Sequence, residues 1–151
     1  MPPGFELEYF QTGTSLTLFE IKSVQLALLI CYESEFPESV RRVVEMGAEL
    51  VVVPTAIVKQ WRQVPFKVIP ARAYENGVFM AYANHCGRQN NSQYLGASCI
   101  VDPSGHELAR AGENEEVITA TLNLKDIAAA RSRVPFLADR SKIPGNSSVI
   151  P

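Results

Sequence analysis

Cys31 is the residue whose position points most directly to chemistry. It follows the stretch 24–30, which ends in the unbroken apolar run 26–30, and it comes just before an acidic segment that contains Pro37. A thiol at the point where a buried strand turns into a helix lies on a rigid support at the carboxyl edge of a sheet, and a helix amino terminus favours the thiolate. The pattern predicts a nucleophilic cysteine. A small thiol buried in the core is the alternative.

The other cysteines and the two histidines give weaker signals. Cys99 lies in an apolar stretch and Cys86 in a loop-like one, and both are predicted to be structural thiols. Three cysteines without Cys-x-x-Cys spacing argue against a disulfide framework or a zinc ribbon. His85 and Cys86 supply two of the four ligands that a closed zinc site needs, so no metal is expected. Activation of Cys31 by His85 or His106, as in a Cys–His thiol hydrolase, remains an alternative.

The elements that must position Cys31 form a strand–helix–strand pattern. A hairpin with its turn at Lys22–Ser23 leads into the run that ends at Cys31. Pro37 suits the first turn of the following helix, which Gly47 ends. The apolar stretch 50–53 then completes a βαβ unit, whose second strand must be a parallel neighbour of the first.

The remaining elements extend this sheet. Their predicted ranges are a helix over 65–76, strands over 78–83, 96–101, 107–111 and 117–122, a helix over 124–131 and an irregular tail over 136–151. The last three strands read as antiparallel. Because the runs 26–30, 50–53 and 78–83 are continuously apolar, we expect both faces of the sheet to be covered by other parts of the protein. The predicted helices are too few to cover both faces.

Composition limits the classes of partner. The chain has 151 residues, 46% of them hydrophobic and 20% charged, which is typical of a soluble globular domain. A formal net charge of −2 gives no basic footprint for nucleic acid. No apolar run approaches the length of a membrane span, and the first residues have no export signal. We therefore expect a cytoplasmic protein with neither a nucleic-acid nor a membrane partner.

Four stretches of the chain, in their order and spacing, resemble the nitrilase, or carbon–nitrogen hydrolase, superfamily. They are residues 29–38, 51–56, 72–79 and 98–105. The resemblance implies an α/β fold, the αββα sandwich of that superfamily. The sandwich is about twice as long as this chain, so residues 1–151 resemble its carboxyl-terminal half as one partial domain.

The resemblance also implies a mechanism. Cys31 would attack an amide carbonyl to form a thioester, with the backbone N–H of Tyr32 holding the oxyanion. Thr55 and Ala56 would border the acyl pocket. A further site glutamate of the superfamily matches Glu6 by its spacing from Cys31, with Glu8 as the alternative. No cofactor is implied.

The chain departs from the superfamily pattern in one large respect. The general-base glutamate and the lysine of the superfamily have no counterpart here. The resemblance therefore implies a homo-oligomer, or a chain completed by a missing amino-terminal half, and a catalytically inactive remnant or interaction subunit is the alternative. Superfamily members that act on N-carbamoyl acids carry arginine just after the nucleophile, where it binds the substrate carboxylate. Here those positions hold Glu33, Ser34 and Glu35, so a small neutral amide or nitrile is the expected substrate.

Overall fold

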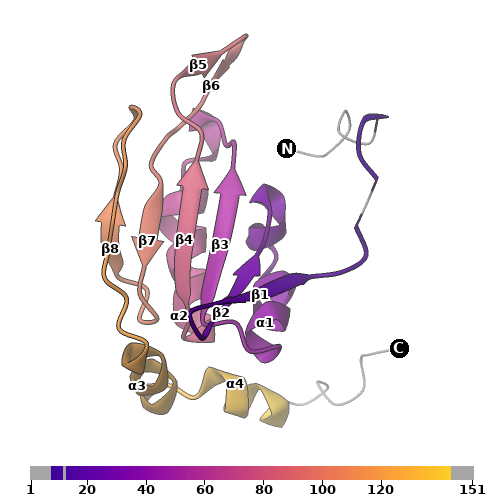
Figure 1. The fold of residues 1–151 in the computed structure, drawn as a ribbon, viewed down its shortest axis with the longest axis vertical. Coiled ribbons are helices and arrows are strands. Elements are labelled where there is room, and N and C mark those ends of the chain that lie inside the picture. Colours follow the sequence, from indigo (N-terminus) through magenta and orange to yellow (C-terminus); the bar gives the residue numbers. More distant parts are fainter. Residues whose placement is uncertain (1–7, 12, 144–151) are drawn as a thin grey trace.

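A six-stranded sheet dominates the structure, a computed structural model that describes residues 8–11 and 13–143. The strand order is β1-β2-β3-β4-β7-β8, and a small hairpin, β5–β6, projects beyond one end of the sheet (Figure 1). The strands are β1 Thr17–Ile21, β2 Val24–Leu28, β3 Leu50–Thr55, β4 Phe79–Asn84, β5 Arg88–Gln89, β6 Ser92–Gln93, β7 Cys99–Val101 and β8 Glu107–Arg110. The helices are η2 Cys31–Glu35, α1 Pro37–Glu45, η3 Lys59–Trp61, η4 Val64–Val68, α2 Ile69–Asn76, α3 Lys125–Arg133, α4 Phe136–Asp139 and η5 Arg140–Lys142.

The β1–β2 hairpin confirms the predicted turn. Ile21 pairs with Val24, which leaves Lys22 and Ser23 as a two-residue loop. Both loop residues have positive φ, 50° and 64°. A two-residue loop of this conformation matches the right-handed twist of the flanking strands and fixes their register.

The centre of the sheet confirms the predicted βαβ unit and extends it. β2 pairs with β3 and β3 with β4, both in parallel, and α1 and α2 form the connections. Pro37 begins α1, where its missing N–H costs no hydrogen bond. Gly77 ends α2 in the left-handed conformation. The expected helix over 65–76 is split, because its first turn, η4, is a π-helix.

Helices cover one face of the sheet. The side chains on this face are fully or almost fully buried, and they form one core with α1 and α2. The strand residues of this core include Ala27, Leu29, Val51, Val53, Met80, Tyr82, Cys99 and Val101, and the helix residues include Val40, Val43, Ile69 and Ala73.

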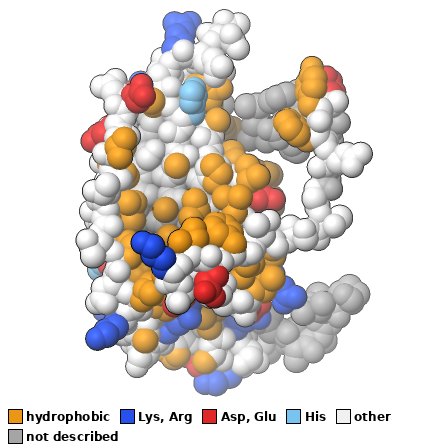
Figure 2. Space-filling view, viewed as in Figure 1, with side chains coloured by type: hydrophobic (Ala, Val, Ile, Leu, Met, Phe, Trp, Pro, Cys, Tyr) orange, Lys and Arg blue, Asp and Glu red, His pale blue; other side chains and the backbone are white. Residues whose placement is uncertain are grey.

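The opposite face of the sheet stays largely open. Leu28, Val52, Ala81 and Ile100 are only half-buried there, and 59% of Ile30 is exposed. Hydrophobic side chains spread over this face, which is turned to the viewer in Figure 2. Near the amino ends of the parallel strands, an apolar groove of about 290 Å³ is lined by residues such as Leu26, Leu50, Leu122 and Leu124. The helices therefore leave one apolar face uncovered, as the continuous apolar runs led us to expect.

Two predicted segments differ from the structure. Residues 117–122 form no strand, and Val117 is 90% exposed, because this segment pairs with neither edge of the sheet. The predicted irregular tail is wrong for residues 136–142, which form α4 and η5. Residues 144–151 lie outside the described part of the chain.

No helix among residues 8–11 and 13–143 is both long and apolar enough to cross a membrane. α1 and α3 have nine residues each, whereas a membrane-spanning helix needs about 20.

Candidate active site

Cys31 lies at a strained corner between β2 and the helical turn η2. The N–H of Leu29 donates to the carbonyl of Val52 at 3.1 Å, so β2 is held beside β3 until two residues before the thiol. Cys31 then begins η2 with a φ of +48°, which is rare for a residue other than glycine. The thiol is half-buried. Such strain persists only where the surroundings enforce it, and it concentrates at functional sites.

Polar contacts within η2 enforce this conformation. The N–H of Ile30 donates to the Glu33 carboxylate at 2.7 Å, and the N–H of Glu33 donates to the Ile30 carbonyl at 3.1 Å. The hydroxyl of Ser34, which is fully buried, donates to the Cys31 carbonyl at 2.8 Å. Sequence reasoning considered Glu33 and Ser34 only as residues that stand where an enzyme for carbamoyl acids carries arginines. Glu33 stands three positions after Ile30, as the acidic residue of a capping box does, and this spacing could have predicted its hydrogen bond to the Ile30 N–H.

Helix α2 anchors the far end of η2. The Arg72 guanidinium donates to the Glu35 carbonyl at 2.6 Å and to the Glu75 carboxylate at 3.0 Å. Burial raises the pKa of the Glu35 carboxyl, against the lowering effect of nearby Arg72. The acidic residues of the corner therefore belong to a connected structure rather than to a freely solvated face.

Thr55 and Ala56 lie at the same edge of the sheet as Cys31. Leu28 of β2 and Val52 of β3 are register partners. Cys31 follows Leu28 by three residues, and Thr55 follows Val52 by three residues. Thr55 is half-buried, whereas Ala56 is exposed. Carboxyl ends of parallel strands form the usual ligand-binding edge of an α/β sheet. The structure thus brings the nucleophile corner and the predicted pocket residues to one edge.

Tyr32 follows the thiol directly. Its side chain is 45% exposed and packs edge-to-face on Phe36, with ring centroids 4.8 Å apart. As the second residue of η2, its backbone N–H lies in the first turn, where a helix supplies no carbonyl partner for its N–H groups. This N–H is therefore a donor that the helix itself does not use.

Asn84 is a structural residue of this edge that sequence reasoning missed. It ends β4 as the register partner of Thr55. Its side chain accepts the N–H of Ile57 at 2.7 Å and donates to the Gly96 carbonyl at 2.7 Å, while its own N–H donates to the Ser98 hydroxyl at 2.9 Å. It joins the loops that follow β3 and precede β7. A polar residue at the end of an apolar strand, level with Thr55, was the available signal.

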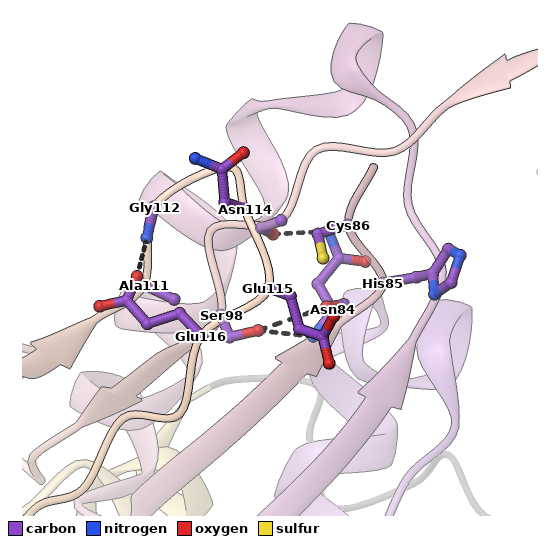
Figure 3. Close-up of a pocket in the computed structure, with 10 residues that line it drawn as sticks. Asn84, His85, Cys86, Ser98, Ala111, Gly112, Asn114, Glu115 and Glu116 are labelled. Carbon is purple, nitrogen blue, oxygen red and sulfur yellow. Dashed lines mark hydrogen bonds between the residues drawn. The ribbon is translucent and has the colours of Figure 1, made fainter. Parts of the chain in front are cut away.

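A cavity of about 420 Å³ opens beside Asn84 rather than at Cys31. It lies between the end of β4 and the loop 111–116, and its polar lining includes Cys86, Ser98, Glu115 and Glu116 (Figure 3). None of Cys31, Tyr32, Thr55 and Ala56 lines it. The cavity is therefore separate from the site that the sequence predicts.

Neither histidine is placed as a base for Cys31. His106 follows β7, which runs antiparallel to β4, so its turn lies at the opposite end of the sheet from Cys31. Its side chain is 79% exposed and pairs with Asp102 at 3.4 Å. His85 follows β4, two strands away from β2, and its ring packs edge-to-face on Tyr94 at 4.4 Å.

The remaining candidate residues are placed as follows. Cys99 is a buried core thiol, as predicted, and burial raises its pKa to about 11. Cys86 is half-buried. Glu6 lies outside the described residues, and Glu8 is exposed. No group of three or more His, Cys, Asp or Glu side chains within residues 8–11 and 13–143 is arranged to hold a metal ion.

The structure thus defines an α/β protein with a mixed sheet, in which a strained cysteine lies at a strand-to-helix corner on the carboxyl edge. The model of one family, carbon–nitrogen hydrolase, matches residues 1–132. The chain belongs to this family, which confirms the resemblance to the nitrilase superfamily that the sequence motifs indicated.

Individual relatives agree with this assignment. The hydrolase in the pqqF 5′ region of Pseudomonas protegens is 42% identical over 123 residues, which cover 82% of this chain and 43% of the relative. The 2-oxoglutaramate amidase of Bacillus subtilis is 31% identical over 138 residues, 89% of this chain and 52% of the relative. The chain therefore spans about half the length of these relatives.

Solved structures show the same fold. The NitN amidase from Nesterenkonia sp. AN1 matches with a TM-score of 0.77 and 34% identity, over 93% of this chain and 55% of that one. In another structure of the Nesterenkonia amidase, acrylamide is joined by Michael addition to the active-site cysteine. The mixed α/β architecture predicted from the sequence is thus that of nitrilase-superfamily amidases.

Proposed function

We propose that this chain carries the nucleophile of an amidase, and that the nucleophile is Cys31. The Cys31 sulfur bonds to the amide carbonyl carbon, the thiol proton passes to the amide nitrogen, and the carbon–nitrogen bond breaks to release ammonia. Water then attacks the thioester, which releases the carboxylic acid and restores the thiol. The observation that carries this proposal is the strained corner at Cys31, with its φ of +48°.

The residues around Cys31 take supporting roles in this proposal. The unused N–H of Tyr32 holds the oxyanion of the tetrahedral intermediate. Thr55 and Ala56 border the acyl group, and their position at the same sheet edge as Cys31 supports this role. Glu6 retains the site role assigned from its spacing.

We propose that the general-base glutamate and the lysine come from outside this chain. No residue of the chain matches either, and the chain spans about half the length of the relatives it matches. The open apolar face, centred on Val52, supports the same inference, because exposed apolar surface of this extent marks an interaction site. An amino-terminal half on that face, or a homo-oligomer, would cover it. A cytoplasmic location is part of this proposal.

We assign a small neutral amide or nitrile as the substrate. Glu33 and Glu35 follow the nucleophile where a carbamoyl-acid enzyme would carry arginines, and carboxylates repel an anionic substrate. The Nesterenkonia amidase supports this class, since one of its structures is a complex with butyramide.

A non-catalytic interaction subunit is the second candidate. It is favoured by the lack of a matching glutamate and lysine in the chain. The Cys–His hydrolase is not favoured, because His106 lies at the opposite end of the sheet and the His85 ring packs against Tyr94.

Ammonia release separates these candidates. We would assay butyramide hydrolysis by this chain alone and by a fusion to the amino-terminal half of the Nesterenkonia amidase, each with a Cys31→Ser control. The amidase proposal predicts ammonia release by the fusion that Cys31→Ser abolishes. A folded fusion that binds butyramide and releases no ammonia would favour the interaction subunit.

A further inference from the structure

Tyr82 carries a buried hydroxyl that the fold itself does not use. The residue lies on β4, is 2% exposed and pairs in register with Val53 on one side and Cys99 on the other. Its side chain belongs to the core on the helix-covered face. Among the residues that the structure describes, the Tyr82 hydroxyl has no hydrogen-bond partner.

An unpaired buried hydroxyl lowers stability, because the group loses its hydrogen bonds to water and gains none in return. Phenylalanine would fill the same space without that cost. The same strand already holds a buried phenylalanine, Phe79, so strand geometry does not demand a tyrosine. The hydroxyl at position 82 therefore calls for an explanation that packing does not provide.

The backbone register relates Tyr82 to the sheet edge at which Thr55 and Cys31 lie. Thr55 lies two residues beyond Val53, the register partner of Tyr82, and side chains two apart on a strand share a face. Cys31 begins η2, three residues beyond Leu28, and Thr55 lies three residues beyond Val52, the register partner of Leu28. The hydroxyl thus extends from β4 toward the edge where Thr55 and Cys31 lie.

Electrostatic effects agree with this placement. Burial raises the pKa of Tyr82 above its ordinary value, and the Thr55 hydroxyl opposes this rise. Charge on Cys31, Cys99 or Glu35 raises it further. Tyr82 therefore stays a neutral phenol at neutral pH, and a neutral phenol can donate a hydrogen bond.

We propose that Tyr82 is a further residue of the catalytic site, whose hydroxyl donates a hydrogen bond to the Cys31 sulfur in its thiolate form. The proposal rests on the role of Cys31 as nucleophile. A hydrogen bond to the charged form of a group favours that form, so Tyr82 stabilises the thiolate that attacks the substrate. The other titratable groups facing this region are Glu35, beside Arg72, and Cys99.

The pH profile of Cys31 alkylation tests this role without requiring amide hydrolysis. The full chain would be treated with iodoacetamide over a range of pH, then digested with trypsin and analysed by mass spectrometry. Residues 23–41, 73–88 and 89–110 form separate tryptic peptides, each with one cysteine, so the three thiols are followed independently. Tyr82→Phe is the test variant, and Tyr74→Phe, which removes an exposed hydroxyl, is the matched control.

Loss of the donor should move the midpoint of the Cys31 profile upward by about one pH unit, which is roughly tenfold slower alkylation at neutral pH. Tyr74→Phe should leave the midpoint unchanged. A purely structural Tyr82 would give a Tyr82→Phe protein of equal or greater thermal stability with an unmoved midpoint, and that result overturns the proposal alone. A wild-type chain in which Cys86 reacts and Cys31 does not would overturn both this proposal and the assignment of the nucleophile.

Discussion

The hydroxyl of Ser34 donates a hydrogen bond to the backbone carbonyl of Cys31 at 2.8 Å, from a side chain that is completely buried. This contact closes the turn on which Cys31, the proposed nucleophile, lies. The conformation of Cys31, with its positive φ, is therefore held from within the same helical turn.

Ser34→Ala should loosen the nucleophile turn. The substitution removes the only side-chain donor to the Cys31 carbonyl among the described residues, and we expect a loss of about 1 kcal/mol in the free energy of unfolding. Alkylation of Cys31 should also slow, because the thiol is less well positioned. Ser39→Ala, a half-buried serine in α1, is the control. Equal effects of both substitutions on Cys31 alkylation would contradict this role for Ser34.

Asn84→Ala should destabilise the sheet edge. The substitution leaves the N–H of Ile57 and the carbonyl of Gly96 without their partner, and both residues are buried. We expect a loss of about 3 kcal/mol in urea unfolding. Asn91→Ala, at an exposed position, should change stability by less than about 0.5 kcal/mol. A loss below about 1 kcal/mol for Asn84→Ala would show that its hydrogen bonds are replaced by water.

Gly96→Ala should cost more stability than Gly87→Ala. Both glycines have positive φ, 65° and 77°. A Cβ at position 96 would lie 2.6 Å from the carbonyl oxygen of Gly112, whereas one at position 87 meets nothing within 4 Å. We expect a loss of about 1 kcal/mol at Gly87 from backbone strain, and about 2–4 kcal/mol at Gly96 from strain and overpacking together. Equal losses would mean that the loop carrying Gly112 moves freely.

Alkaline pH should destabilise the fold through Cys99. Burial raises the pKa of this thiol from its ordinary 9.0 to about 11, so the folded state retains a proton that the unfolded state has lost in this window. Stability should fall as pH rises above 9, by roughly 1 kcal/mol at pH 10. The raised pKa of Tyr82 adds a loss in the same direction above its ordinary value of 10.0. Cys99→Ala should flatten the decline between pH 8 and pH 10, and an unchanged slope in that variant would exclude Cys99 as its source.

Local patterns were sufficient to predict the central elements. The turn at Lys22–Ser23, the helix that begins at Pro37 and the parallel strands around Val52 all follow from apolar periodicity and from residues that start or stop an element. The position of Cys31 at a strand-to-helix corner follows from the same reasoning.

The elements that were missed depend on contacts between distant residues. α4 is held by an edge-to-face contact of Phe136 with Tyr74, at 5.3 Å, and η5 by an ion pair between Arg140 and Glu45. Residues 117–122 have the composition of a strand, but a strand forms only where a neighbour supplies its hydrogen bonds. Neither kind of contact is visible in a local pattern.

The candidate site could be predicted only in part, because some of its residues also depend on contacts between distant parts of the chain. Cys31, Thr55 and Ala56 could be placed because parallel strands end at one edge. Asn84 and Tyr82 could not, since the loops and the corner that they face come from other parts of the chain.

The most direct test of the central claim, that Cys31 is the nucleophile, is the order in which the three thiols react with acrylamide at neutral pH, followed by the masses of their tryptic peptides. Acrylamide adds to the active-site cysteine in a mutant of the Nesterenkonia amidase. We predict that the adduct appears first on residues 23–41, which contain Cys31, and that Cys99 stays unmodified in the folded chain. An adduct that appears first on residues 73–88, at Cys86, would contradict the assignment.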